Sequence, residues 1–550
     1  MNNIRMKKFL LSAFLLTFAL IAQAQKDSIE FANAVDGKLL KAAYINLNKI
    51  GYGFSLSPDR KLVAIKLLSF EKQNSGNDEL CLYDLQEHKT LWTQPMDSYS
   101  ASFDAGMDQG KEASLSKNGW RRSNTMQLMS HGLLLSDGST IRMYDTNTGK
   151  RVWKSNFHTL FTNDGHDAMM GYKTAQTSKL SALQLSSGKK IWEQKVPHLY
   201  NWGWDNVLIA NDTSMMVVNN NINFLNPLTG RLQMYKARVG YEEVGKGLLK
   251  GLAIGLAAGM VGGLVGVGPI YMPYFANDSR YVDEDAMTYL YSNIYVKDGR
   301  NYVSDRDSLY CFDSSTYKKL WSYGGERKAI AHARLFSEGD TLFLLNYGYG
   351  LEAGYKRKKV SRPFIASFNI ETGKMLHTTY LAEEKRMLVD AVGTSKGALM
   401  AFNDALAYQA VEDTTLKTQP WNASAYGAIV AIPKDTIYTF RQNDEVLTPL
   451  YNHPNRYVII TDKNKMLCVN KELSVTDDYS ANNIYRVMGK YKNFNIVGMD
   501  TDNGYDMWIV RKSGQPVARI NKPVHQLDIV GDKLFLLYDK GLVIFDMKML

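Results

Sequence analysis

Cysteine is scarce in this sequence: three residues among 550, far apart along the chain. So few cysteines argue against a disulfide framework as the means of stabilising the fold. Cys311 and Cys468 each lie two residues before a turn residue, where other repeats of the chain carry apolar side chains. We therefore expect these cysteines to fill buried strand positions, because a thiol packs as a small hydrophobe.

The usual catalytic signatures are missing as well. The nine histidines form no His-x-x-x-His or His-Glu pair, and neither a Gly-x-Ser-x-Gly elbow nor a phosphate-binding loop occurs. Two acidic stretches, residues 163–167 and 283–285, lack the spacing of an EF-hand, so we expect polar loops there without a bound metal. No catalytic residue can be assigned, although catalysis is not excluded.

Positive charge exceeds negative charge but is not concentrated. The formal net charge is +10, and it falls to +7 if residues 1–24, which carry three basic residues, are removed. The short basic run of residues 356–359 is expected in a solvated loop rather than in an anion-binding patch. This distribution does not indicate a nucleic-acid partner.

A repeated strand–turn–strand unit is the strongest feature of the sequence. A run of alternating apolar residues leads to Asp, Asn or Gln, which can bond forward to the following residues in an Asx-type turn. Gly four residues later supplies the positive φ of a short hairpin loop, and Trp eight residues later can be buried in the second strand. The copies are Asp84 with Trp92; Asp145 with Thr148, Gly149 and Trp153; Gln184 with Gly188 and Trp192; Asn226 with Gly230; Asp313 with Trp321; and Asn369 with Gly373.

Repeats of about 40 residues with several strands each, and no long amphipathic helix, predict an all-β fold of the β-propeller type. The spacing of the repeats predicts seven or eight blades. Met234 and His377 stand at two of the Trp positions, and we expect His377 to be a packing substitute. Residues 53–65 should form an early hairpin, and the C-terminal hairpin at residues 534–545 should complete a blade begun near the N-terminus.

The pattern Ala-x-Asp-x-x-Thr-Gly-x-x-x-Trp resembles the signature repeat of the pyrroloquinoline-quinone-type β-propeller superfamily, which is WD40-like in architecture. The resemblance covers residues 80–380 well and the remainder in outline. It implies that each Trp docks between adjacent blades. The enzymes of this superfamily bind the quinone with calcium beside adjacent cysteines, which this chain lacks. The similarity is therefore to the non-enzymatic branch, and we expect no cofactor; pyrroloquinoline quinone and calcium belong only to the alternative, an unusual quinoprotein oxidoreductase.

Residues 1–24 have the form of a signal peptide. Basic residues Arg5, Lys7 and Lys8 precede an apolar run at 9–21 and a small-residue cleavage site at 22–24. Cleavage after Ala24 would leave residues 25–550 as the propeller domain, exported to the periplasm or the cell envelope. Because no cysteine stands at the cleavage site, we do not expect a lipid anchor.

An apolar insertion interrupts the repeats at residues 246–273. No charged residue occurs from 251 to 274, a length that is sufficient for one bilayer crossing. Small residues at every fourth position let helices approach closely, whereas several interior glycines make a poor helix in water. We expect contact with a membrane surface or a protein partner, with a Gly-rich loop packed on the propeller as the alternative. The repeating glycines are Gly247, Gly251, Gly255, Gly259 and Gly263.

Together these patterns predict an exported β-propeller that acts as a binding or scaffold module without catalysis. Besides the oxidoreductase, a second alternative is binding of glycans or peptides by the loops of one propeller face. Trp202 and Trp204 are candidate stacking residues for such a ligand, although an aromatic pair at a blade edge is the simpler interpretation.

Overall fold

The structure is a computed structural model. Residues 1–24, the pair Trp202 and Trp204, and the insertion at 246–273 lie outside the part that it describes. The described residues are 27–68, 78–96, 119–123, 125–136, 140–173, 179–196, 207–218, 221–236, 287–288, 291–352, 356–381, 388–394, 397–402, 405–410, 417–420, 428–430, 437–440, 447–449, 456–460, 465–470, 472–480, 484–501 and 503–550.

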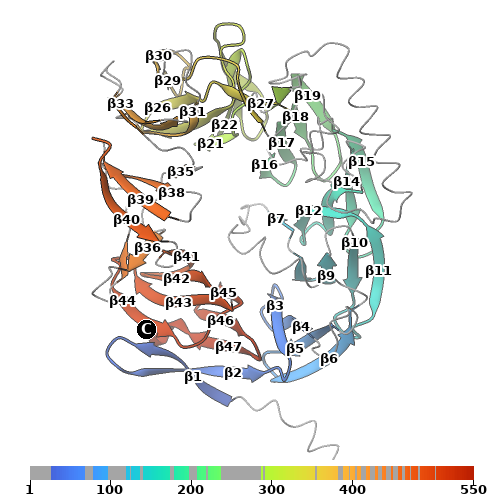
Figure 1. Cartoon of the computed structure of the whole chain (residues 1–550). Coiled ribbons are helices and arrows are strands. Elements are labelled where there is room, and N and C mark those ends of the chain that lie inside the picture. Colours follow the sequence, from blue (N-terminus) through green and yellow to red (C-terminus); the bar gives the residue numbers. More distant parts are fainter. Residues whose placement is uncertain are drawn as a thin grey trace, which may run out of the picture.

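Antiparallel strands make up almost all regular structure in these residues, and the expectation of an all-β fold is confirmed. One short 3₁₀-helix, η5 (Met547–Met549), follows the last strand. The strands form four-stranded units that succeed one another around a ring in chain order (Figure 1). We number these units as blades 1 to 10, with the inner strand first and the outer strand last.

The first five blades follow the repeat motif. Blade 1 is β3 (Ile50–Leu56), β4 (Leu62–Leu68), β5 (Glu79–Asp84) and β6 (Lys89–Pro95); blade 2 is β8 (Met126–Met129), β9 (Gly132–Ser136), β10 (Thr140–Tyr144) and β11 (Arg151–Asn156). Blade 3 is β12 (His158–Asn163), β13 (Ala168–Tyr172), β14 (Lys179–Gln184) and β15 (Lys190–Lys195), with β7 (Trp120–Arg122) along its inner edge. Blade 4 is β16 (Val207–Asn211), β17 (Ser214–Val218), β18 (Ile222–Leu225) and β19 (Leu232–Lys236); blade 5 is β21 (Tyr295–Lys297), β22 (Arg300–Ser304), β23 (Ser308–Asp313) and β24 (Lys319–Gly324).

The motif fades after blade 6. Blade 6 is β25 (Ala333–Glu338), β26 (Thr341–Asn346), β29 (Phe364–Asn369) and β30 (Met375–Tyr380); blade 7 is β31 (Leu388–Thr394), β32 (Gly397–Phe402), β33 (Ala405–Ala410) and β34 (Lys417–Pro420). Blade 8 is β35 (Ala428–Val430), β38 (Arg456–Ile460), β39 (Lys465–Asn470) and β40 (Val475–Ser480). Blade 9 is β41 (Ile484–Tyr491), β42 (Phe494–Thr501), β43 (Gly504–Arg511) and β44 (Pro516–Ile520); blade 10 is β45 (Gln526–Val530), β46 (Lys533–Tyr538), β47 (Gly541–Asp546) and β2 (Leu39–Asn46).

Strand pairing thus gives ten four-stranded units in the described residues, and the count of seven or eight blades is not confirmed. The repeat motif marks only the turns of blades 1 to 6. Blades 7 to 10 pair without its Thr-Gly and Trp signals, so the spacing of the motif could not number them.

The two ends of the chain meet in one sheet, as expected from the C-terminal hairpin. β2 pairs with β47, which makes an N-terminal strand the outer strand of the last blade (Figure 1). β1 (Asp27–Ala34) pairs with β2 on one side and with β44 of blade 9 on the other. Blades 9 and 10 are therefore joined into one 11-stranded sheet, which β36 (Ile437–Phe440) and β37 (Leu447–Pro449) extend beyond β41.

A small additional sheet leaves the ring at blade 6. It consists of β20 (Met287–Thr288), β27 (Tyr349–Glu352) and β28 (Lys356–Lys359), in that order. The expectation of a loop at residues 356–359 was wrong, because these basic residues form the edge strand β28. β28 forms because its backbone pairs with that of β27, and the local sequence of residues 356–359 does not indicate this pairing.

The core lies between neighbouring blades. Middle strands such as β9 and β17 are buried at every position, since one blade covers each of their two faces. The outer strand β11 instead exposes alternate residues. Cys81 and Cys311 are free thiols buried in this core, and burial raises the pKa of Cys311 to about 11. The expectation of an inert, packed thiol is confirmed for Cys311.

Candidate interaction sites on the blade ring

The repeat turns are closed by their first side chain. In blade 2, Asp145 Oδ1 accepts the Thr148 backbone N–H and hydroxyl at 2.7 Å each, and these hydrogen bonds lower the pKa of the carboxyl group. The backbone N–H of Gly149 donates to Asp145 O at 2.8 Å, with Gly149 at a φ of 69°. The same closure recurs with Asp84, Gln184, Asn226, Asp313 and Asn369 as the first residue.

The structure brings each Trp onto the turn of the following blade rather than onto its own. The indole of Trp92 donates to Thr146 O at 2.7 Å, and a Cβ placed on Gly149 would lie 2.8 Å from its ring. Only glycine leaves room for this approach. Equivalent pairs join blades 2 to 3, 3 to 4 and 5 to 6, through Trp153 with Gly188, Trp192 with Gly230, and Trp321 with Gly373. We call this arrangement the Trp–Gly contact.

The interface between blades 4 and 5 lacks the Trp–Gly contact. Blade 4 has Met234 at the Trp position, with 48% of the residue exposed, and blade 5 has Tyr317 at the Gly position. Tyr317 adopts a φ of 56°, and its ring stacks on Phe224 of blade 4 with centroids 4.3 Å apart. Burial raises the pKa of the Tyr317 phenol. The ring of Tyr317 from blade 5 therefore packs against blade 4 and fills this part of the interface.

His377 departs from the expected packing role. The side chain lies exposed on β30, with Nε2 2.8 Å from the hydroxyl of Thr379 on the same strand. It therefore does not replace Trp in a contact between blades.

An ion pair with a buried carboxylate also joins blades 4 and 5. Lys236, the last residue of β19, contacts the carboxylate of Asp305 and donates to Tyr310 OH at 2.8 Å. Tyr310 OH also donates to Asp305 Oδ2 at 3.0 Å, and the Asp305 side chain is only 2% exposed. Burial lowers the pKa of Lys236, but the bonds with Asp305 and Tyr310 outweigh it and the net shift is upward.

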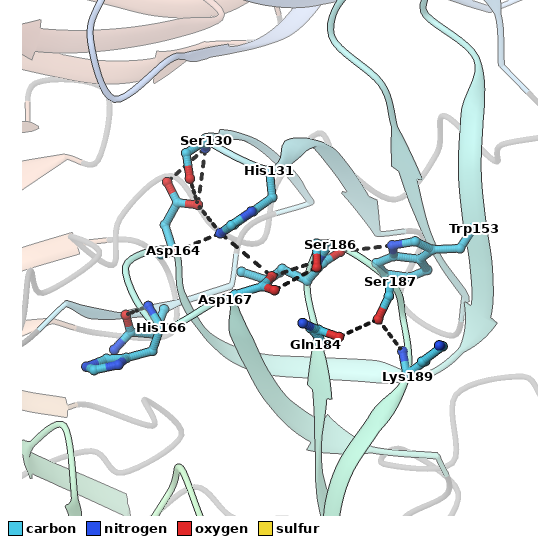
Figure 2. A network of polar contacts seen from close by, with 12 residues as sticks. Ser130, His131, Trp153, Asp164, His166, Asp167, Gln184, Ser186, Ser187 and Lys189 are labelled. Atoms are coloured by element: carbon cyan, nitrogen blue, oxygen red, sulfur yellow. Dashed lines mark hydrogen bonds and ion pairs between the residues drawn. The ribbon is translucent and has the colours of Figure 1, made fainter.

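A polar network joins the turns of blades 2 and 3 (Figure 2). Ser130, in the turn after β8, donates its N–H at 2.9 Å and its hydroxyl at 2.8 Å to the Asp164 carboxylate. His131 Nε2 lies 3.1 Å from the backbone oxygen of Asp164 and 3.7 Å from Asp167 Oδ1. Asp167 accepts two hydrogen bonds from Ser186, at 2.7 Å from its backbone N–H and at 2.6 Å from its hydroxyl.

This network links neighbouring blades, and its carboxylates are occupied by hydrogen bonds within the network. His166 of the same loop continues it to Asp212 of blade 4, with Nε2 to Oδ2 at 3.0 Å. The loop at 163–167 is a polar hairpin turn between β12 and β13, as expected. Within the described residues, no group of three or more His, Cys, Asp or Glu side chains is arranged to hold a metal ion.

In the sequence the insertion lies between Lys236, at the end of β19 in blade 4, and β20 of the small additional sheet. β20 pairs with β27 through Met287 with Glu352 and Thr288 with Leu351. Among the described residues, no helix has the length and apolar character needed to span a membrane.

Comparison with known proteins agrees with the repeat motif. A family model described as outer membrane protein assembly factor BamB matches residues 137–243, which include blades 3 and 4. The chain carries β-propeller repeats of the pyrroloquinoline-quinone type, as the sequence motif predicts. No curated protein matches the sequence.

Two solved propellers illustrate the structural matches. BamB from Moraxella catarrhalis is 11% identical, with 73% of this chain and 98% of BamB covered and a TM-score of 0.31. Hsv2 from Kluyveromyces lactis is 8% identical, with 78% of this chain and 99% of Hsv2 covered and a TM-score of 0.28.

Proposed function

We propose that this chain is an exported, non-catalytic β-propeller that serves as a binding or scaffold module at the cell envelope. The observation that carries the proposal is the match of residues 137–243 to the model of an outer-membrane assembly factor. The inter-blade contacts in this region support it, because interlocked blades give a rigid frame on which loops can present a binding surface. The signal peptide at 1–24 remains part of the proposal.

The apolar insertion at 246–273 is proposed to attach this module to a bilayer surface or a protein partner. The closure of β2 on β47 limits how it can do so. Blades precede and follow the insertion, and a ring closed by its two chain ends must lie on one side of a membrane. A single crossing would separate the blades, so the segment must lie in the interface, re-enter, or dock on a protein.

Membrane partitioning of the mature protein tests this attachment. The matched variant has residues 246–273 replaced by a short Gly/Ser linker, and both proteins are washed at high salt and alkaline pH. We expect the native chain to stay with membranes and the variant to become soluble with an unchanged circular dichroism spectrum. Equal solubility and stability of the two proteins would remove the insertion from the attachment role.

A further inference from the structure

We propose that the outer edge of β30 in blade 6 is a dimerisation site, at which β30 of a second copy of this chain pairs antiparallel. The pairing joins the two copies of blade 6 into one continuous sheet across a two-fold axis beside Thr379. The inference concerns the rim of the ring, and it depends neither on the proposed export nor on the insertion.

β30 differs from the other outer strands in composition. Its sequence, Met-Leu-His-Thr-Thr-Tyr, contains no Lys, Arg, Asp, Glu or Pro. Charged residues and prolines on an edge strand keep foreign strands from pairing with it. Each of the other nine outer strands contains at least one such residue; these strands are β6, β11, β15, β19, β24, β34, β40, β44 and β2. Among the described blades, only blade 6 therefore presents an outer strand without this protection.

The backbone of β30 directs hydrogen-bonding groups away from its own blade. Leu381, directly after the strand, donates its N–H to Pro363 O at 3.0 Å. Because bonded and non-bonded residues alternate in an antiparallel pair, Thr379 also bonds to β29, whereas Thr378 and Tyr380 direct their N–H and C=O groups outward. Among the described strands, β30 pairs only with β29. These outward groups are therefore placed to bond an added strand.

Apolar side chains line this edge. Met375, Leu376 and Tyr380 are 40%, 55% and 46% exposed. The hydroxyl of Tyr323 in blade 5 donates to Met375 Sδ at 3.2 Å, and the guanidinium of Arg362 lies 4.3 Å from the centre of the Tyr380 ring. Arg362 precedes β29, so its charge lies one strand inward from the edge. An added strand would thus cover apolar surface as well as backbone groups.

Blade 9 shows that an outer edge of this ring accepts a further strand. There β1 pairs antiparallel with the outer strand β44, with Asn33 opposite Arg519. The N–H of Val35 continues the ladder to Val517 O at 2.9 Å. This pairing forms on a strand that contains both a proline and an arginine. The uncharged edge of β30 offers the same geometry with fewer obstacles.

The composition of β30 favours a second copy of itself as the occupant. Antiparallel self-pairing places Thr378 opposite Tyr380 of the second copy, and Tyr380 opposite its Thr378, so that both pairs exchange their outward N–H and C=O groups. No like charges meet, because the paired residues carry none. Lys374 lies in the turn before the strand, outside the paired residues. A partner selected by charge would find no cation or carboxylate on β30 to recognise.

Sedimentation velocity of the mature protein at increasing concentration tests the proposal. We expect a weak monomer–dimer equilibrium, since one short strand buries less surface than a standard interface. The variant Thr378→Lys introduces the residue that blade 2 carries at the equivalent position, where Lys154 is exposed. The control Thr93→Lys makes the same change at the equivalent exposed position of blade 1. The dimer dissociation constant should rise at least about 10-fold in the variant and change less than about twofold in the control.

Two results would overturn the dimerisation site: a native protein that stays monomeric at every concentration, or two variants that weaken the dimer equally. Hydrogen–deuterium exchange of a peptide spanning residues 375–380 gives a second readout on the native protein. The amides of Thr378 and Tyr380 should exchange rapidly in dilute protein and slowly in concentrated protein. Protection that does not change with concentration would mean that the chain itself covers this edge, and it would overturn the site even if Thr378→Lys misfolds.

Discussion

The interface between blades 3 and 4 and the interface between blades 4 and 5 are built by different means. In the first, Trp192 is buried, packs over Gly230 and donates to Pro227 O at 2.9 Å. In the second, Met234 is half exposed, and aromatic packing with an ion pair whose carboxylate is buried takes the place of the Trp–Gly contact. Blade 4 takes part in both interfaces, so its two faces can be compared directly.

The difference shows that the Trp and the Gly that act together belong to two successive blades. The motif residues are therefore best paired by interface and not by blade. Blade 4 has the glycine that Trp192 needs but has no Trp of its own, whereas blade 5 has Trp321 but Tyr317 at the glycine position. A glycine is present where the preceding blade supplies a Trp, because a Cβ would collide with the indole ring. In each copy of the motif, the Gly position thus depends on the preceding blade and the Trp position on the following blade.

The largest loss of stability is expected from a substitution that removes the Trp–Gly contact. Trp192→Ala should lower the free energy of unfolding by about 3–5 kcal/mol, because it empties a buried site and leaves Pro227 O without its donor. Met234→Ala, at the equivalent position of blade 4, should cost less than about 1 kcal/mol since the side chain is half exposed. Urea unfolding of both variants measures the difference, and similar losses would contradict the distinction between the two interfaces.

Local chemistry explains what the sequence could predict. Asp145 and Gly149 determine their turn through contacts within five residues, so the strand–turn–strand unit was readable from the motif. That Trp153 would dock on a neighbouring blade followed from the family resemblance. The terminal hairpin was likewise evident from its apolar strands, and its partner β2 is where the prediction placed it, near the N-terminus.

The parts that could not be predicted depend on residues far apart in the chain. Lys236 meets Asp305 across 69 positions, with no signal in either local sequence. The strand at 356–359 pairs with β27 despite its unbroken charge, and Tyr317 replaces glycine with a ring that only a three-dimensional neighbour explains. Blades 7 to 10 lack the motif, so long-range strand pairing alone defines them.

An intermediate effect is expected from the ion pair that replaces the Trp–Gly contact. Lys236→Met should cost about 2–3 kcal/mol, because the Asp305 carboxylate would stay buried without its cation. Adding Asp305→Asn should recover part of this loss. Lys179→Met, which breaks the surface pair with Glu193 at 3.2 Å, should cost less than about 0.5 kcal/mol. Urea unfolding again gives the values; a loss no larger than that of Lys179→Met would mean that aromatic packing alone holds blades 4 and 5.

The smallest expected effect is a pH dependence of stability, which turns that begin with Asp should show and turns that begin with Asn should not. Hydrogen bonds from Ser315 and Thr316 lower the pKa of Asp313 to about 2, below its value in an unfolded chain. The stability that this carboxylate contributes is therefore complete above about pH 4 and is lost as the pH falls toward about 2. Because the turn is exposed, solvent screening should keep the contribution below about 1 kcal/mol.

Exchanging the first turn residue between blades 4 and 5 tests that assignment. Asp313→Asn should reduce the fall in melting temperature between pH 5 and pH 2.5, since an amide does not titrate. Asn226→Asp, in the corresponding turn of blade 4, should increase that fall, because Leu228 and Thr229 would donate to a carboxylate from the N–H groups that now bond Asn226. If both variants lose melting temperature on acidification as the native protein does, the acid sensitivity of the ring arises outside these turns, and the two blade faces differ only in how they pack.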